Sequence, residues 1–325
     1  MCSRGSVRKG GDRLRITAPL IEAETGAHLW AEKFDGALDD IFDLQDQITE
    51  RIVGVVEPSV LKSEIERSRR KPPDNLAAYD LYLRALPHMA VSMPPEARVA
   101  AQLLDDALRL DPTFAAAHAQ LSHCHEICFF RDGFDPAVRN AGLAHARAAL
   151  ASGTDDALSL ATAGFVVWVL GQDYESAVSA VERALSHNPC CTTALIWGAW
   201  LAGSGGDSAR AIAWGERALR LSPFDPLVYL ACSALGNTAI HDGRYEDAAS
   251  HYGRGAQLNP HFSYIHVGHA VSLSLAGRAK EARAAARRAL DLEPTFRFGQ
   301  MVMILRSPTL AERFAAGARS AGLPE

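Results

Sequence analysis

The chain has 325 residues, of which 48% are hydrophobic and 22% charged, and its formal net charge is -5 at pH 7. This composition supplies a hydrophobic core, and the acidic balance argues against a dedicated nucleic-acid-binding protein. No apolar run approaches the roughly 18 residues that span a bilayer. Residues 1–11 are basic and glycine-rich and lack the apolar core of a secretory signal. We therefore expect a cytoplasmic protein whose six cysteines are reduced thiols.

The N-terminal segment alternates apolar and polar side chains, which is typical of half-buried strands. The clearest alternation has its apolar positions at Leu14, Ile16, Ala18 and Leu20. We predict strands at residues 14–20 and 28–34, a turn at residues 24–26, and a third strand at residues 3–9. All three strands precede the first helical pattern.

A long helical pattern follows at residues 39–70, where apolar residues recur at steps of three and four. They are Ile41, Leu44, Ile48, Ile52, Val55 and Val56. Pro58 interrupts the pattern and predicts a kink or a break. The charged run at residues 64–71 is interpreted as a solvated helix end before a linker; a nucleic-acid or membrane contact is the alternative.

Three phrases of this N-terminal segment carry a family resemblance. They are GSVRK at residues 5–9, TGAHLWAEKFD at residues 25–35 and DIFDLQDQIT at residues 40–49. The segment resembles the TolB/FlgO-like α/β module that precedes helical repeats in bacterial signalling proteins, among them class III adenylate cyclases and some winged-helix regulators. That module normally begins with a further βα portion. The resemblance therefore implies that this chain is the C-terminal part of such a protein, or a shortened relative.

Beyond residue 76 the strongest signal is an internal repeat. Five helix-like phrases each end in a proline, namely Pro112, Pro189, Pro223, Pro260 and Pro294, and the last three intervals are 34, 37 and 34 residues. Proline cannot continue a helix, so each one ends the second helix of a unit. The first interval, 77 residues, contains two units with no proline between them.

Small residues recur at fixed distances before these prolines, as close helix contacts require. Twelve residues before each proline stand Ala100, Ala177, Ala211, Ala248 and Ala282. Five residues before it stand Ala107, Ala184, Ala218, Gly255 and Ala289. In the unit without a proline we predict the matching pair at Ala141 and Ala148.

This pattern resembles the tetratricopeptide repeat over about 250 residues. The predicted fold class is mainly α, an α-solenoid of tetratricopeptide helical hairpins preceded by a small, incomplete α/β segment. The predicted domains are the α/β segment at 1–71, a linker at 72–75, about six hairpins at 76–294 and capping helices at 295–325. A helical bundle without repeats is the alternative.

Sequence motifs for catalysis, phosphate binding or metal binding are weak compared with the repeat signal. The glycine-rich residues 203–208 lack the Lys-Ser/Thr of a phosphate loop, and no GxSxG or HExxH spacing occurs. The most metal-like cluster is His123, Cys124, His125 and Cys128. Zinc sites take ligand pairs from two segments, and no second pair stands out. We predict no catalytic residue, no metal and no cofactor.

The repeat resemblance indicates where a partner would bind. Stacked hairpins curve, and the first helix of each pair is expected to line the concave side. The residues placed near that side are His123, Glu126, Phe165, Trp168, Trp200, Asn237, His241 and Tyr264. Exposed aromatic side chains anchor interfaces, while Phe165 and Trp168 fit equally well as packing between neighbouring helices. Trp200 and Asn237 are the preferred contacts.

The function implied by the resemblance is a non-catalytic interaction scaffold, or regulatory region, of a bacterial signalling protein. It would bind a protein or peptide in the concave groove. The alternative is an adenylate cyclase-related chain that serves cyclic AMP synthesis when joined to an upstream catalytic domain. A DNA-linked regulator is a third possibility, which the acidic balance disfavours.

Overall fold

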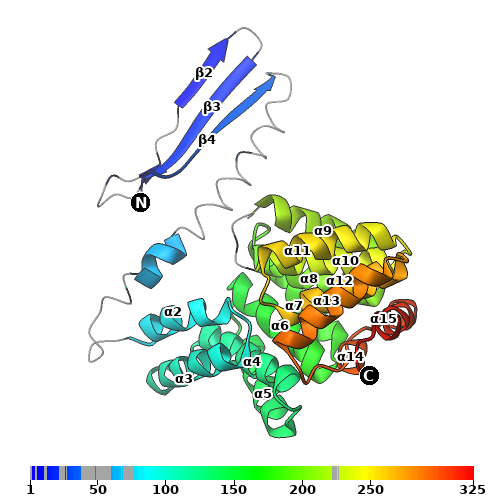
Figure 1. Cartoon of the computed structure of the whole chain (residues 1–325). Coiled ribbons are helices and arrows are strands. Elements are labelled where there is room, and N and C mark those ends of the chain that lie inside the picture. The colour runs from blue at the N-terminus through cyan, green and yellow to red at the C-terminus, as the bar shows by residue number, and fades with distance from the viewer. Residues whose placement is uncertain are drawn as a thin grey trace.

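The structure is a computed structural model that describes residues 2–3, 6–10, 13–21, 26, 28–37, 48, 60–66, 68, 77–221, 225 and 227–325. In this part of the chain a small antiparallel sheet near the N-terminus is followed by an array of helices (Figure 1). None of the described helices combines the length and apolarity of a membrane-spanning segment.

The sheet is built around strand β3 (Arg13–Ile21). Strand β4 (His28–Ala37) pairs with one edge of β3. Strands β1 (Cys2–Ser3) and β2 (Ser6–Gly10) pair with the other edge in one continuous register. All pairings are antiparallel, so the three predicted strands are confirmed, the third at residues 2–3 and 6–10, which the structure describes.

One face of the sheet is apolar, as the alternating pattern predicted. Leu14, Ala18 and Phe34 are buried together, and Ile16 and Ile48 pack against them. The opposite face shows charged residues, including an ion pair from Arg15 to Asp35.

The long helical pattern is described only in part. Residues 48, 60–66 and 68 are helical, whereas the predicted break at Pro58 and the domain boundaries between residues 71 and 76 lie outside the described residues. The Ser68 hydroxyl donates to the Asp80 carbonyl at 2.8 Å, and the Arg84 guanidinium donates to the Ser68 carbonyl at 2.7 Å. Ser68 therefore contacts the first helix of the array.

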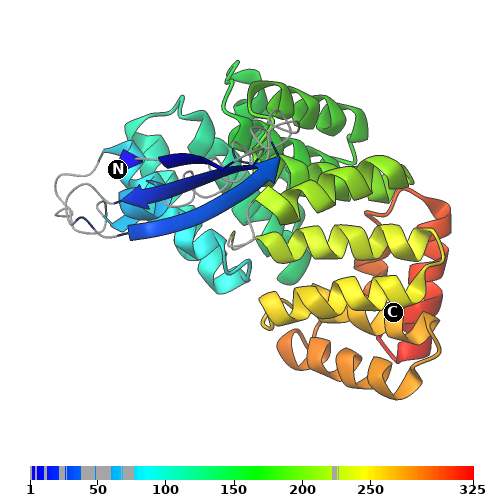
Figure 2. The ribbon, with the colours of Figure 1, turned by 90° about the horizontal axis from the view of Figure 1, so that it is seen from above.

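The array consists of six helical hairpins in the part of the chain that is described. They pair α2 (Ala78–Met89) with α3 (Pro94–Leu110), α4 (Ala115–Arg131) with α5 (Pro136–Ala151), α6 (Ala157–Gly171) with α7 (Tyr174–His187), α8 (Thr192–Gly205) with α9 (Ser208–Leu221), α10 (Val228–His241) with α11 (Tyr245–Leu258), and α12 (Ser263–Leu275) with α13 (Ala279–Leu292). Figure 2 shows the later hairpins stacked side by side in chain order.

The small residues predicted before the prolines do lie at the helix contacts. All nine alanines of the two predicted sets are fully buried. A Cβ added to Gly255, the remaining member, would lie 2.6 Å from the Ile265 Cδ1 atom. Each of these residues stands a fixed number of positions before the proline that ends its helix. This spacing keeps the same helix face turned toward the neighbouring helix in every unit.

The prediction for the unit without a proline was wrong by one residue. Ala148 is exposed, whereas the next residue, Ala149, is 1% exposed. Gly142 replaces Ala141 at the contact, because a Cβ there would meet Leu170 Cδ1 at 2.8 Å. One residue turns a helix by about 100°, and no proline fixed the phase here.

The two helices of a hairpin differ in how they are covered. The second helices α7, α9, α11 and α13 each bury four residues or fewer and are amphipathic. The first helices α6, α8 and α10 are buried along nearly their whole length. A helix that is apolar all round must be covered on every side, so other parts of the chain cover the inner face of this array.

The C-terminal residues supply part of that cover. Helix α14 (Phe298–Val302) is short, and α15 (Pro308–Ala321) packs mainly against α12, with further contacts to α10 and α13. The approach of α15 is close, since a Cβ at Gly317 would lie 2.9 Å from the Val271 carbonyl oxygen. Helix α15 therefore covers first helices instead of forming a seventh hairpin.

Candidate partner-binding surface on the inner face

The inner face of the array lines a cavity of about 60 Å³. Its walls come from the first helices α4, α6, α8, α10 and α12, together with residues 301 and 304 after the last hairpin. Of the eight residues predicted for the groove, five line this cavity: His123, Glu126, Phe165, Trp200 and Tyr264.

Stacked aromatic rings form one wall. The rings of Phe165 and Trp197 stack with centroids 3.8 Å apart, and His123 meets the Trp197 ring edge-on at 5.7 Å. The Trp200 indole N–H donates to the Leu230 carbonyl at 3.1 Å, and also lies 3.0 Å from the Ser233 hydroxyl. These contacts order the wall by linking α8 to α10.

A histidine and a carboxyl group contribute the polar part. His123 Nε2 lies 3.6 Å from Glu126 Oε2, and these two side chains are only 8% and 14% exposed. Burial raises the pKa of Glu126 to about 7, although the positive charge of Arg131 opposes this. Burial, together with the positive charge of Arg131, lowers the pKa of His123 to about 4. Near pH 7 His123 is therefore neutral, and Glu126 is partly protonated.

Arg131 closes the cavity by joining hairpins that are far apart in sequence. Its guanidinium carbon lies 4.7 Å from the ring centroids of both Phe262 and Tyr264, and its Nη1 donates to the Ser92 carbonyl. The Tyr229 hydroxyl lies 3.3 Å from the Ser92 hydroxyl. The array therefore curves until its first two hairpins touch the last two.

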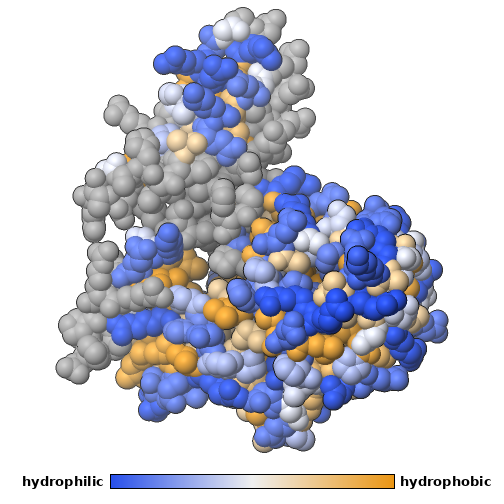
Figure 3. All heavy atoms as spheres, in the orientation of Figure 1, coloured by the Kyte–Doolittle hydropathy of each residue, from blue (hydrophilic) through white to orange (hydrophobic). Residues whose placement is uncertain are grey.

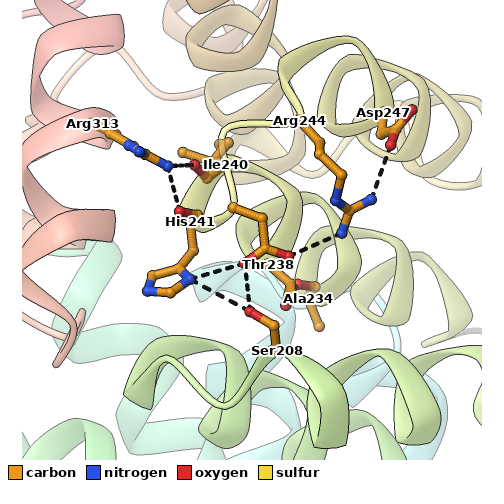
Figure 4. Close-up of polar contacts among 9 residues, drawn as sticks. Ser208, Ala234, Thr238, Ile240, His241, Arg244, Asp247 and Arg313 are labelled. Carbon is orange, nitrogen blue, oxygen red and sulfur yellow. Dashed lines mark hydrogen bonds and ion pairs between the residues drawn. The ribbon is translucent and has the colours of Figure 1, made fainter.

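Three predicted groove residues lie elsewhere. Asn237 is 2% exposed, and its Oδ1 accepts a hydrogen bond from the Tyr252 hydroxyl at 2.6 Å, which places it between α10 and α11. His241 lies at the end of α10, where its Nδ1 is 3.1 Å from Asp242 and its carbonyl accepts from Arg313 of α15 (Figure 4). Trp168 is 4% exposed and lines a separate, open hollow.

Two open hollows flank the cavity, and both are lined by Met303 and Ile304. The larger, about 350 Å³, has a mixed lining that also includes Trp168, Gln172, Asp173, Tyr174, Glu175 and Arg306. The smaller, about 260 Å³, contains aromatic and aliphatic side chains, among them Phe129, Phe130, Phe134, Val169 and Leu170. Met303 stands between the hollows and is 59% exposed, so the apolar part of this surface is reachable from solvent.

A second apolar surface lies on the first hairpin. Hydrophobic residues gather over α3 in Figure 3, and Val99 and Leu110 of that helix are 46% and 59% exposed. Neither Val99 nor Leu110 lines the cavity or the two hollows, so this surface serves below as a control.

The structure also defines the cysteine–histidine cluster of α4. Cys124 is fully buried, and its thiol lies 3.1 Å from the Met89 sulfur. Burial raises the pKa of Cys124 well above its usual value, which favours the protonated thiol. Among the residues that the structure describes, no three His, Cys, Asp or Glu side chains converge as metal ligands would.

Trp200 is expected to contribute to stability through its indole N–H. We expect Trp200→Phe to destabilise the chain by about 1–3 kcal/mol, because the change removes two hydrogen bonds and leaves a small void. Urea unfolding followed by circular dichroism measures the effect. Phe298→Leu, another buried aromatic change without a hydrogen bond, is the comparison. An unchanged unfolding midpoint for Trp200→Phe would show that its N–H contacts contribute nothing.

The sequence missed Arg131, Trp197, Tyr229 and Phe262, which all line the cavity. The sequence did contain one sign of a covered inner face, because α6 and α8 have no polar face. Helices of this kind predict an inner face that is covered. The pairing of α4 with α12 depends on the curvature of the whole array, and no local pattern encodes it.

Comparisons with known proteins agree with the architecture. A family model described as "Tetratricopeptide repeat" matches residues 170–226 and 233–295. A solved structure of the hetero-tetramer Cut9-Hcn1 of the APC/C aligns with a TM-score of 0.54 at 15% identity, over 86% of this chain and 49% of that one. A monomeric mutant of IFIT1 with Gppp-AAAA aligns with a TM-score of 0.55 at 15% identity, over 77% of this chain and 60% of that one. At these identities the likeness concerns the fold alone.

One curated relative matches in sequence. "Putative adenylate cyclase 3" of Rhizobium meliloti (strain 1021) is 39% identical over 118 residues, which are 36% of this chain and 20% of that protein. The match thus spans about a fifth of the relative's length, and it does not place a catalytic domain in this chain. The six hairpins, their small-residue contacts and the matching family model together identify the helical array as a tetratricopeptide-repeat solenoid.

Proposed function

We propose that this chain is a non-catalytic, cytoplasmic regulatory region of an adenylate cyclase-related signalling protein. Its array binds a protein or peptide partner on the inner-face surface formed by the two hollows and Met303. The observation that carries the proposal is this solvent-reachable apolar surface, in which aromatic side chains from α4 and α6 adjoin an exposed methionine. Met and aromatic residues are enriched in protein interfaces.

The partner is expected to contact the hollows before it reaches the cavity. The cavity of about 60 Å³ holds only a few water-sized volumes, and Met301 and Ile304 contribute to its lining. The hollows are several times larger and open. Binding there buries apolar area that is now exposed, which is the main favourable term in association.

Photo-cross-linking tests the location of the partner site. A photoreactive phenylalanine derivative replaces Met303 in the full chain, and a matched variant carries it at Leu110, which is equally exposed. In an extract of the producing cells we expect a discrete adduct from position 303 that excess unlabelled chain suppresses, and none from position 110. Equal adducts at both positions, or none at position 303, contradict the proposal.

Cyclic AMP synthesis is the alternative function, motivated by the cyclase relative. The purified chain with ATP and Mg²⁺ or Mn²⁺ is expected to form no cyclic AMP above a blank without protein. Cyclase catalysis requires carboxylates that hold metal ions at a triphosphate, and the described residues present no group of three or more His, Cys, Asp or Glu side chains placed to hold a metal ion. Product formation in proportion to chain concentration would establish the enzymatic alternative instead.

A further inference from the structure

The inner face already carries a segment of the chain itself. Residues 301–307, here named the strap, run from the end of α14 to the start of α15. We propose that the strap is an intramolecular ligand of the partner site, and that the partner segment which displaces it has the same chemistry. That chemistry is two apolar side chains three residues apart, followed by a basic residue. The inference rests on the proposed function and adds the partner class and its regulation.

The apolar part of the strap fits the cavity. Met301 and Ile304 both line it, together with Phe165, Trp197 and Trp200. The Ile304 N–H donates to the Met301 carbonyl at 3.2 Å, so this stretch forms a helical turn. Residues three apart on such a turn share one face. The strap therefore presents its apolar pair to the aromatic wall as a short helical ligand would.

The basic part of the strap lies outside the cavity. Arg306 Nη1 is 3.4 Å from the Glu175 carboxylate, and the guanidinium carbon is 4.3 Å from the Tyr174 ring centroid. The Arg306 and Glu175 side chains are 53% and 84% exposed, so the ion pair is weak in water. The position of this ion pair indicates that the surface accepts a positive charge next to Met301 and Ile304.

The strap is held mainly by apolar burial, since Met301 and Leu305 are 4% and 7% exposed. One backbone hydrogen bond joins it to the first helices, from the Ser307 N–H to the Ser204 carbonyl at 2.6 Å. By contrast, Arg313 of α15 donates to the carbonyls of Ile240 and His241 (Figure 4). Leu310 and Phe314 of the same helix are fully buried. With α15 anchored, the strap can leave the inner face as a local opening.

The hollows on either side explain why a partner could replace the strap. They leave Met303 exposed and provide surface that the strap does not use. A longer segment with the same apolar pair would fill the cavity and bury the hollows as well. Because a tethered strap acts at an effective concentration of about millimolar, only a segment that gains such additional contacts displaces it.

A peptide in trans tests the proposal on the full chain. The probe is a fluorescent peptide of residues 298–307 (FGQMVMILRS), measured by anisotropy. The double variant Met301→Asp, Ile304→Asp cannot seat its own strap in an apolar cavity, and we expect it to bind the peptide at least about tenfold more tightly than the unaltered chain. The double variant Val99→Asp, Leu110→Asp is the matched control; both side chains are exposed on α3, outside the cavity and the two hollows, so it is expected to match the unaltered chain.

The peptide also has its own control, in which aspartates replace its Met301 and Ile304 equivalents and binding is expected to vanish.

If the Met301→Asp, Ile304→Asp variant fails to fold by circular dichroism, Arg306→Ala replaces it, because the Arg306 side chain is more than half exposed. That variant is expected to increase peptide binding by about threefold, through loss of one weak ion pair.

Failure of this inference differs from failure of the proposed function. A folded, opened variant that does not bind the peptide overturns the intramolecular-ligand proposal, even if cross-linking from position 303 succeeds. Peptide binding to the opened variant without any cross-linked partner supports the intramolecular ligand and contradicts the partner proposal. Equal peptide binding by the Met301→Asp, Ile304→Asp variant and by the Val99→Asp, Leu110→Asp control also overturns the inference.

Discussion

Gly268→Ala is expected to destabilise the array by about 3 kcal/mol or more, because an added methyl group would overlap a fully buried ring. A Cβ at Gly268 of α12 would lie 2.6 Å from Cδ1 of Tyr252 and closer still to Cε1 and Cζ. On the other side of the ring, a Cβ at Gly236 of α10 would lie 2.5 Å from it. The ring thus has no free space on either side.

The hydroxyl of the same ring is also fixed. Tyr252 is 1% exposed, and its hydroxyl donates to Asn237 Oδ1 at 2.6 Å. The ring therefore cannot move away from a new methyl group without breaking a buried hydrogen bond. The methyl group is instead expected to separate α11 from α12, which loosens the contact between the last two hairpins.

Urea unfolding of Gly268→Ala at constant pH measures the effect. Gly299→Ala is the matched control, because nothing lies within 4 Å of a Cβ there, and its midpoint is expected to change little. In a Tyr252→Leu background the cost of Gly268→Ala should shrink, since the two positions are in contact. An unfolding midpoint equal to that of the Gly299 control would contradict the packing described here.

Glu126→Gln is expected to stabilise the protein by about 2 kcal/mol at pH 8 and to have little effect at pH 4.5. The pKa of Glu126 is raised by burial from 4.5 to about 7 in the folded state. A raised pKa contributes stability that is complete below pH 4.5 and is lost as the pH rises through about 7. Above that pH the folded chain retains a buried charge, which Gln avoids.

His123 changes stability in the opposite direction. Its pKa falls from 6.5 to about 4 on folding, so its contribution is present above pH 6.5 and is lost as the pH falls through about 4. Comparing Glu126→Gln with the unaltered chain at each pH cancels this term, because both proteins keep His123. The difference between the two curves then reports Glu126 together with its contact to His123.

Urea titrations between pH 4.5 and pH 8 provide this measurement. Glu312→Gln, on the exposed face of α15, is the control and is expected to show a nearly constant difference from the unaltered chain. Should Glu126→Gln prove equal in stability or less stable at pH 8, the carboxyl would have to be ionised and stabilised by a group that binds it. A buried carboxyl group that lowers the stability of the folded chain is characteristic of a functional site.

The repeat architecture was predictable because its determinants are local. The prolines that end the second helices and the alanines before them specify where two neighbouring helices touch, and such contacts join residues close in sequence. The strands near the N-terminus were likewise predicted from alternation, and β3 and β4 confirm it. Where a local marker was missing, between Pro112 and Pro189, the predicted contact was off by one residue.

The candidate site was predicted only in part. His123, Glu126 and Trp200 line the cavity as the positions on the first helices suggested. Asn237 was preferred from the sequence, yet its side chain is bonded to Tyr252 between two helices. The same helical position can face a groove or a neighbouring helix, and the difference is a rotation that depends on packing.

By itself, the sequence determined the number of hairpins, their order and the residues at which paired helices touch, because each of these depends on contacts within about 35 residues. Only the tertiary structure decided that the array curves until Ser92 reaches Tyr229 and Phe130 reaches Tyr264, contacts that span 137 and 134 positions. It also decided that the chain's own strap lies on the inner face. Curvature is the sum of small rotations between successive hairpins, and no single repeat encodes that sum.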